Sequence, residues 1–387
     1  MKIRFIGMIL AFALDLSTCG NSQESMYSPE DRTAIEMAQF ETGTVKDPAF
    51  SGKVSGCYYA GGSRIIVAAD KLYLYDIQKG KNIASADISM EDLCVQTYAD
   101  GYFIVGQGTG GSSDGSFVTS QSSGGINGYI LNKDFAIRDT ISFNGLLSDD
   151  LILQTTGAAI SQDGKQVAFG GLQGLYLYDT SSQKVREVLN YSENGRADNM
   201  KIGTMDSLAF AGDSTLAYVG TATDASKGGD GFSVYGTVSI DSAKLTIAKK
   251  AGYQVASDEV QKGGDLLIMP QSFNRNNGTL LMFDTAANTE KTMSFSSGSE
   301  GKDGVYCSGQ GEYVATAILE ESSVTINIYD TASEKCIHTE TVHDSNSTYF
   351  LRVPQILILD ESGTCIVVLG RGIDEVNTLI TTFGFAG

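Results

Sequence analysis

The chain has 387 residues and a net charge of −19, from 27 basic and 46 acidic side chains. So acidic a surface repels phosphate backbones and anionic lipid headgroups, which argues against nucleic-acid binding and against direct adsorption to membranes. Glycine is plentiful with 45 residues, proline is scarce with 4, and tryptophan is absent. With common Tyr and Phe, this composition favours many short strands joined by tight turns.

The N-terminus has the features of an export signal. Lys2 and Arg4 precede an apolar run over residues 5–16 that is too short to span a membrane. The run ends in Leu16-Ser17-Thr18-Cys19-Gly20, which resembles the lipobox of bacterial lipoproteins. The resemblance implies that Cys19 is lipidated and becomes the first mature residue. Because Thr18 stands where that family prefers Gly or Ala, an ordinary secretory signal cleaved near this point remains an alternative.

These features divide the chain into three parts. Residues 1–19 are expected to be the lipoprotein signal peptide, residues 20–32 a polar tether, and residues 33–387 one folded domain. Either form of the signal places the mature chain outside the cytoplasm. We expect it to be held at the cell membrane by the lipid anchor only, or secreted if Cys19 is not lipidated.

One element recurs along the domain: an alternating apolar strand, then Asp or Asn, then a polar turn. The period is about fifty residues, which is typical of one four-stranded blade per repeat. The Asp has a structural role in this pattern. Its side chain can accept a hydrogen bond from the backbone N–H two residues later, which closes the turn. The repeats carry it at Asp76, Asn132, Asp179, Asp241, Asp284 and Asp330.

The clearest repeat supports a known architecture. Ile160-Ser161-Gln162-Asp163-Gly164-Lys165 resembles the turn between the first two strands of TolB-like and WD40-like propellers, and the resemblance covers the chain from about residue 33. It implies an all-β, seven-bladed propeller with four-stranded antiparallel blades. In the third blade the strands are expected at residues 157–162, 165–170, 174–178 and 184–190. In the sixth they are expected at residues 305–309, 313–319, 324–329 and 336–342.

The last repeat lacks one strand. The seventh blade begins near Gln355, and the chain stops one strand short of completing it. Propellers close their ring by borrowing a strand from the other end of the chain, which removes an open edge. The segment Thr33–Glu41 can supply that strand. The alternative is a short helix, because Ala, Glu and Met favour one.

The long connections between strands are expected on one face of this predicted propeller. The turns between the first and second strands (a–b) and between the third and fourth (c–d) are short. Long connections follow the second strand (b–c) at residues 106–125, 221–231 and 270–278, and link blades (d–a) at residues 144–156, 191–204 and 343–349. Long loops on a rigid scaffold commonly carry binding. The candidate contact residues there are Asp198, Asn199, Phe273, Asn274, Arg275, His343, Asp344, Arg371 and Asp374.

Motifs for known cofactors are weak. The glycine-rich run at residues 106–111 leads into no helix, so a phosphate site is not expected. Asp224 and Asp230 lack the alternating acids of a calcium loop. Only two histidines occur, and His338, in a fourth strand, is expected to face solvent. No cofactor, metal or catalytic residue is predicted.

The remaining cysteines, Cys57, Cys94, Cys307, Cys336 and Cys365, follow no disulfide or zinc spacing. We expect most of them to be small apolar residues within strands.

Two functional hypotheses remain. The first is a monomeric, non-catalytic surface lipoprotein that serves as a binding or assembly scaffold for an envelope or extracellular protein or a carbohydrate. The resemblance to TolB-like propellers, which scaffold envelope partners, supports it. The alternative is a lactonase-like hydrolase or lyase, which requires a metal or a buried acid/base pair at the channel mouth, including His343 or Asp344.

Overall fold

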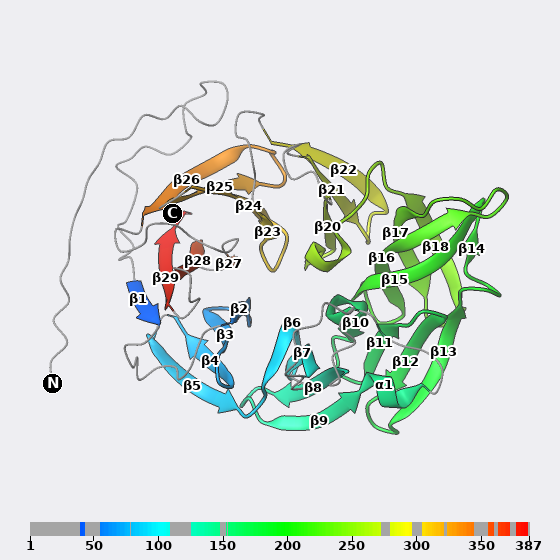
Figure 1. The fold of residues 1–387 in the computed structure, drawn as a ribbon, viewed down its shortest axis with the longest axis horizontal. Coiled ribbons are helices and arrows are strands. Elements are labelled where there is room, and N and C mark those ends of the chain that lie inside the picture. Colours follow the sequence, from blue (N-terminus) through cyan, green and yellow to red (C-terminus); the bar gives the residue numbers. More distant parts are fainter. Residues whose placement is uncertain are drawn as a thin grey trace, which may run out of the picture.

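The repeated pattern forms seven antiparallel sheets arranged as blades around a common axis (Figure 1). This arrangement confirms the predicted all-β, seven-bladed propeller. In each blade the strands are named a to d from the axis outward. The computed structural model describes residues 39–42, 55–77, 79–108, 125–147, 152, 154–271, 279–295, 304–320, 323–343, 355–359, 363–371 and 377–385.

Blades 1 to 3 each contain four strands. The predicted strands of blade 3 are confirmed, with every end within two residues of the observed one. Blade 1 comprises β2 (Gly56–Tyr59), β3 (Arg64–Ala68), β4 (Leu72–Asp76) and β5 (Lys81–Ala86). Blade 2 comprises β6 (Met90–Tyr98), β7 (Gly101–Gly108), β8 (Ile126–Asn132) and β9 (Ile137–Ser142). Blade 3 comprises β10 (Ala158–Ile160), β11 (Gln166–Gly170), β12 (Gly174–Asp179) and β13 (Lys184–Asn190).

Blade 4 has a fifth, short strand, and blades 5 and 6 have four each. Blade 4 comprises β15 (Met200–Phe210), β16 (Thr215–Asp224), β17 (Phe232–Ser239) and β18 (Lys244–Lys250), with β14 (Arg196–Ala197) beside β15. Blade 5 comprises β19 (Gln261–Gly263), β20 (Leu266–Pro270), β21 (Thr279–Asp284) and β22 (Thr289–Ser294). Blade 6 comprises β23 (Gly304–Cys307), β24 (Tyr313–Leu319), β25 (Ser323–Asp330) and β26 (Cys336–His343).

Blade 7 joins the two ends of the chain. Its strands are β27 (Gln355–Leu359), β28 (Thr364–Arg371), β29 (Asn377–Gly384) and β1 (Gln39–Thr42). Strand β1 pairs antiparallel with β29, with Gln39 opposite Thr381 and Thr42 opposite Thr378. The predicted N-terminal closing strand is thereby confirmed at residues 39–42, and residues 33–38 lie outside the described part. Pairing removes the open edge of β29.

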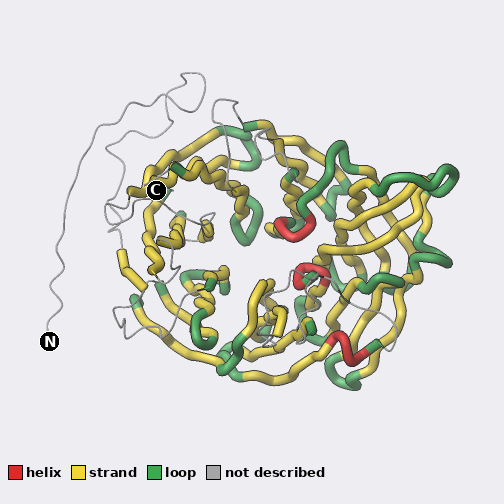
Figure 2. Tube along the Cα trace, viewed as in Figure 1, coloured by secondary structure: helices red, strands yellow, loops and turns green. Residues whose placement is uncertain are grey.

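The helical segments of the described chain are short and lie in connections between blades. They are α1 (Phe143–Leu146) and the 3-10 turns η2 (Thr155–Gly157) and η3 (Ser257–Glu259). Figure 2 shows two of these turns close to the centre of the ring. Thus strands build the scaffold, and the 3-10 turns contribute to its inner rim.

The recurrent Asp closes the c–d turn as predicted in the blades where it ends strand c. Asp179 Oδ1 accepts the backbone N–H groups of Ser181 at 3.1 Å and Ser182 at 2.7 Å. Blade 4 differs: strand β17 ends at Ser239, whose Oγ accepts the N–H of Ser242 at 3.3 Å. The prediction that Asp241 occupies this position was wrong, because the strand ends two residues earlier.

The core consists of layers between neighbouring blades. Each of the seven buried apolar clusters in the described residues joins two adjacent blades. Leu359 and Ile366 of blade 7 pack with Ile65 and Val67 of blade 1, so the first and last blades meet through the same kind of apolar contact. Burial of both sheet faces drives the ring to close.

Cysteine and histidine positions follow this packing. The five cysteines of the described strands are free thiols, and Cys57 and Cys365 are buried, as expected of small apolar residues. Burial raises the pKa of the Cys57 thiol to about 12. The prediction that His338 faces solvent was wrong: its side chain is 8% exposed and stacks on Phe383 of blade 7, with ring centroids 5.4 Å apart. Blade packing buries this side of β26.

Candidate functional site

The connections differ between the two faces of the ring. We call the face with the b–c and d–a connections the loop face, and the face with the a–b and c–d connections the turn face. The turn face has short connections throughout, such as residues 99–100 and 180–183. On the loop face some connections are equally short, such as residues 171–173, but all the long ones lie there. The strand bounds confirm the prediction that the long connections lie on one face.

Blade 4 is lengthened at its loop-face ends. Two segments that the sequence suggested to be loops are partly strands: β16 continues to Asp224, and β14 forms a hairpin with the first residues of β15. Met200 pairs with Asp224, and Ala222 with Phe232, so the added residues continue the same sheet. Figure 1 shows β14, β15 and β18 reaching the outer edge of the ring. Continued pairing satisfies the backbone of this extension, which loops would leave to water.

The predicted contact residues within the described chain lie on three blades. Asp198 and Asn199 form the exposed tip of the β14–β15 hairpin, and Asp198 has a φ of 51°. His343 ends β26 and is exposed, and Arg371 ends β28. Strand direction places all four at the loop face, but on blades 4, 6 and 7, so they do not form one cluster. Cys19, Phe273, Asn274, Arg275, Asp344 and Asp374 lie outside the described residues.

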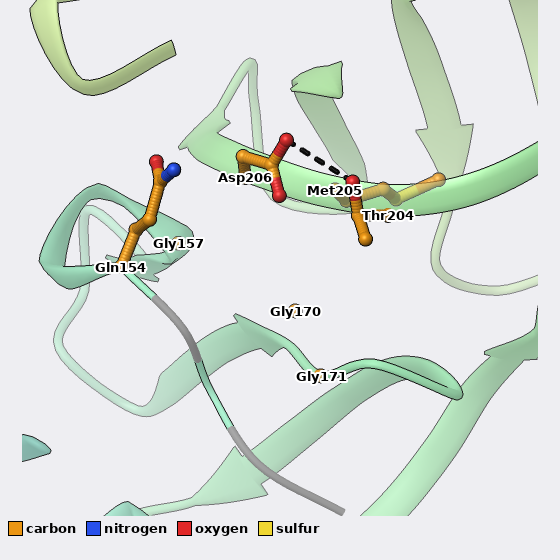
Figure 3. A pocket seen from close by; sticks show the side chains of 7 residues that line it. All are labelled: Gln154, Gly157, Gly170, Gly171, Thr204, Met205 and Asp206. Carbon is orange, nitrogen blue, oxygen red and sulfur yellow. Dashed lines mark hydrogen bonds between the residues drawn. The ribbon is translucent and has the colours of Figure 1, made fainter. Parts of the chain in front are cut away.

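A recess that the sequence did not reveal lies where blades 3 and 4 meet. It is an open recess whose empty space of about 200 Å³ includes solvent, and it is lined by Gln154, Gly157, Gly170, Gly171, Thr204, Met205 and Asp206. Gly157 precedes strand a of blade 3 and Gly170 ends its strand b, so the recess belongs to the loop-face side. Figure 3 shows the side chains of Gln154 and Asp206 on opposite sides of it.

Two irregularities in β15 bring Asp206 to the recess. The register of β15 against β16 shifts between Ile202 and Thr204 and again between Met205 and Ser207, leaving Asp206 without a cross-strand partner. Bulges of this kind redirect a side chain from the sheet. The backbone of β15 approaches β16 and β11 so closely that glycine is required at one position of each. A Cβ on Gly220 would lie 2.0 Å from Thr204 O, and one on Gly170 would lie 2.3 Å from Met205 O.

The Asp206 carboxylate is half-buried and belongs to a short chain of hydroxyls. Thr204 Oγ1 lies 3.0 Å from Asp206 Oδ2 and 2.8 Å from Thr221 Oγ1. Burial raises the pKa of Asp206, and the hydrogen bond from Thr204 offsets part of that rise. The dominant effect is desolvation, which disfavours the charged form.

The opposite wall is held by side chains from two connections between blades. Gln154 Oε1 accepts hydrogen bonds from Thr156 Oγ1 at 3.4 Å and from Ser257 Oγ, in η3, at 3.3 Å. Thr156 Oγ1 also lies 2.9 Å from the backbone oxygen of Asp206. Blades 3, 4 and 5 therefore meet at this rim through polar contacts. No sequence motif marks these residues, and the only available signal was an acid within the apolar segment Met205–Phe210.

The calcium and metal sites considered from the sequence gain no support from the described residues. Asp224 Oδ1 accepts the N–H groups of Ser226 at 2.8 Å and Lys227 at 3.1 Å, so its carboxylate closes a turn. Within the described ranges, no three His, Cys, Asp or Glu residues are grouped so that they could hold a metal ion. The described chain also contains no helix of the length and apolarity needed to cross a membrane.

Comparisons with known proteins support the fold alone. No family model matches the chain, and no curated protein matches it. The β-propeller domain of Cps50 (Swd1) from Myceliophteria thermophila is similar in structure, with a TM-score of 0.56 and 9% sequence identity over 89% of this chain and 98% of that domain. KlHsv2 with loop 6CD replaced by a Gly-Ser linker has a TM-score of 0.49, with 10% identity over 87% of this chain and all (100%) of that one.

Proposed function

We propose that this protein is a non-catalytic, surface-exposed lipoprotein whose loop face binds a partner, as a binding or assembly scaffold. The observation that carries the proposal is the difference between the two faces: every long connection, and the extension of blade 4, lies on the loop face. Neutral variation in loop length would lengthen both faces. Binding surfaces on rigid scaffolds are built from such connections.

The direction of the closing strand supports this proposal. Strand β29 follows a b–c connection and so begins at the loop face, and Thr42 lies opposite Thr378 near that beginning. Gln39, opposite Thr381, therefore lies nearer the turn face. A tether from a lipid on Cys19 would reach the ring from the turn-face side. The loop face would then be directed away from the membrane and accessible to a partner.

Face-specific cross-linking in intact cells tests the scaffold. A photo-reactive amino acid at Lys227, in the exposed b–c connection of blade 4, should form a discrete adduct with one partner. The matched control is Asp213, exposed in the a–b turn of the same blade on the turn face. Asn199 is a second loop-face position for the same photo-reactive amino acid. Equal adducts from Lys227 and Asp213, or no adduct from either Lys227 or Asn199, would contradict the proposal.

The lipid anchor has its own test. Metabolic labelling with an alkyne fatty acid should label the wild-type chain and leave Cys19→Ser unlabelled and released from the membrane fraction. An unlabelled wild-type chain in the soluble exported fraction would instead support the ordinary secretory signal. That outcome would leave the loop-face proposal standing.

A further inference from the structure

The β14–β15 hairpin carries two positive charges directly opposite each other. Arg196 pairs with Lys201 in the antiparallel register, and Lys201 pairs in turn with Thr223 of β16. Directly opposite residues share one face of a sheet, with their Cβ atoms about 5 Å apart. These three side chains therefore form a row across three strands, which we call the cationic row.

The cationic row lies on the face of the blade 4 extension that is turned away from the apolar core. Ile202, the next residue along β15, points to the other face and is buried in the cluster between blades 3 and 4. Arg196 is exposed, and Lys201 and Thr223 are partly exposed. Gly203, two residues beyond Lys201, is exposed and adds no side chain to this face. An extended segment can therefore reach the row on open surface, without an enclosed pocket.

The fold supplies no counter-charge to the row. The ion pairs within the described ranges include neither Arg196 nor Lys201. Of the nearest acids, Asp198 lies in the hairpin turn and the carboxylate of Asp224 closes a turn of its own. Like charges directly opposite each other destabilise a sheet. A local arrangement that folding does not favour is typical of a functional surface.

The chemistry of the row fits an acidic protein segment. The guanidinium group of Arg196 can bind both oxygens of a carboxylate, and the ammonium group of Lys201 can add a second charge. The row presents no aromatic ring on which a sugar could stack, which disfavours a carbohydrate. Because acids outnumber cations 46 to 27 in the chain, an acidic segment is repelled from most of the surface, and the row fixes where it can bind.

We propose that the cationic row binds an aspartate or glutamate side chain in an extended acidic segment of the partner protein. This inference rests on the proposed function, since the row lies on the loop face and specifies the chemistry of that partner. Arg196 and Lys201 are then recognition residues, and Thr223 adds a hydroxyl group beside them.

Fluorescence anisotropy of acidic peptides with the mature chain tests the row. The probe is a labelled, capped peptide of alternating glutamate and serine, and its control has glutamine in place of glutamate. Only the glutamate peptide should bind, and about 0.5 M NaCl should weaken its binding because salt screens exposed charges. Arg196→Gln combined with Lys201→Gln should weaken binding at least about threefold. Lys244→Gln, at an exposed lysine on the turn face of the same blade, should bind as the wild type does.

Thermal unfolding separates recognition from a structural role. The double variant removes the repulsion between Arg196 and Lys201, so its unfolding midpoint should equal or exceed that of the wild type. Lys201→Arg, which keeps the charge, should retain peptide binding. A lowered midpoint of the double variant, or unchanged peptide binding by it, would overturn the proposal.

Two further arms identify the class of partner and the level of a failure. Tighter binding of oligogalacturonate than of the glutamate peptide would indicate an acidic carbohydrate and overturn the assignment to a protein. In cells, the adduct at Lys227 should decrease in the double variant. If the double variant forms as much adduct as the wild type, the row proposal fails and the loop-face proposal stands. If the wild-type adduct is absent, the loop-face proposal fails whatever the peptides do.

Discussion

Gln96, in strand a of blade 2, binds the backbone of strand a in blade 3 at two points. Its Nε2 donates to Ala158 O at 2.8 Å, and its Oε1 accepts from Ile160 N at 3.2 Å. Two other glutamines in strand a reach the next blade in the same direction: Gln261 Oε1 accepts from Cys307 N, and Gln355 Oε1 accepts from Cys57 N. These side chains connect neighbouring blades near the axis, where the short inner strands offer little apolar area.

Removing this connection should destabilise the ring. Gln96→Ala leaves the N–H of Ile160 and the carbonyl of Ala158 without their side-chain partner, which should cost about 1–3 kcal/mol of unfolding free energy. Urea denaturation measures the change. Gln254→Ala, at an exposed position, is the control and should be neutral. Equal stability of the two variants would contradict a structural role for Gln96.

Close packing of β15 against β16 depends on Gly220. A Cβ there would lie 2.0 Å from Thr204 O, a backbone atom that can move only with the strand. Gly220→Ala should therefore cost about 3 kcal/mol and displace the Thr204–Asp206 segment. Thermal unfolding measures the loss of stability, and the NMR signal of the Met205 methyl group reports the displacement of the Thr204–Asp206 segment. Gly252→Ala is the matched control, since nothing lies within 4 Å of its added Cβ.

Ring closure by β1 makes a prediction about proline. Successive N–H groups of a strand point to opposite sides, so only one of Phe40 and Glu41 directs its N–H toward β29. Proline at that position removes a ladder hydrogen bond and should lower the unfolding midpoint clearly, while proline at the other should be tolerated as on an edge strand. Differential scanning calorimetry of Phe40→Pro and Glu41→Pro measures both. Two unaffected variants would argue against the closing strand.

The turn at Asp179 should make stability depend on pH. Hydrogen bonds from Ser181 and Ser182 lower the pKa of Asp179 to about 2. Because the folded-state pKa lies below the unfolded one, near 4, the stabilisation is complete above about pH 4 and is lost as pH falls toward 2. The difference in unfolding midpoint between wild type and Asp179→Asn should shrink over that interval. A difference that stays constant over that interval would contradict this role of Asp179.

Much of the fold could be predicted from local patterns. The turn-closing Asp, the tight Asp163-Gly164 turn and the alternating strands are short-range features, and each leaves a trace in adjacent residues. The error at Asp241 shows the limit even here, because a strand end that shifts by two residues moves the turn to Ser239. His338 shows another limit, because its exposure depends on Phe383 of the next blade.

The sequence alone indicated the repeated blades and most of their strands, since these depend on period and alternation, but it left the N-terminal segment as either a closing strand or a short helix. The positions of Gln154 and Asp206 on opposite sides of a recess, and the binding of Gln96 to blade 3, became evident from the folded structure alone. These contacts join residues far apart in the chain, through bulges and glycines that permit close backbone approach. Local pattern carries no record of which distant backbone a side chain will meet, because blade packing sets that distance.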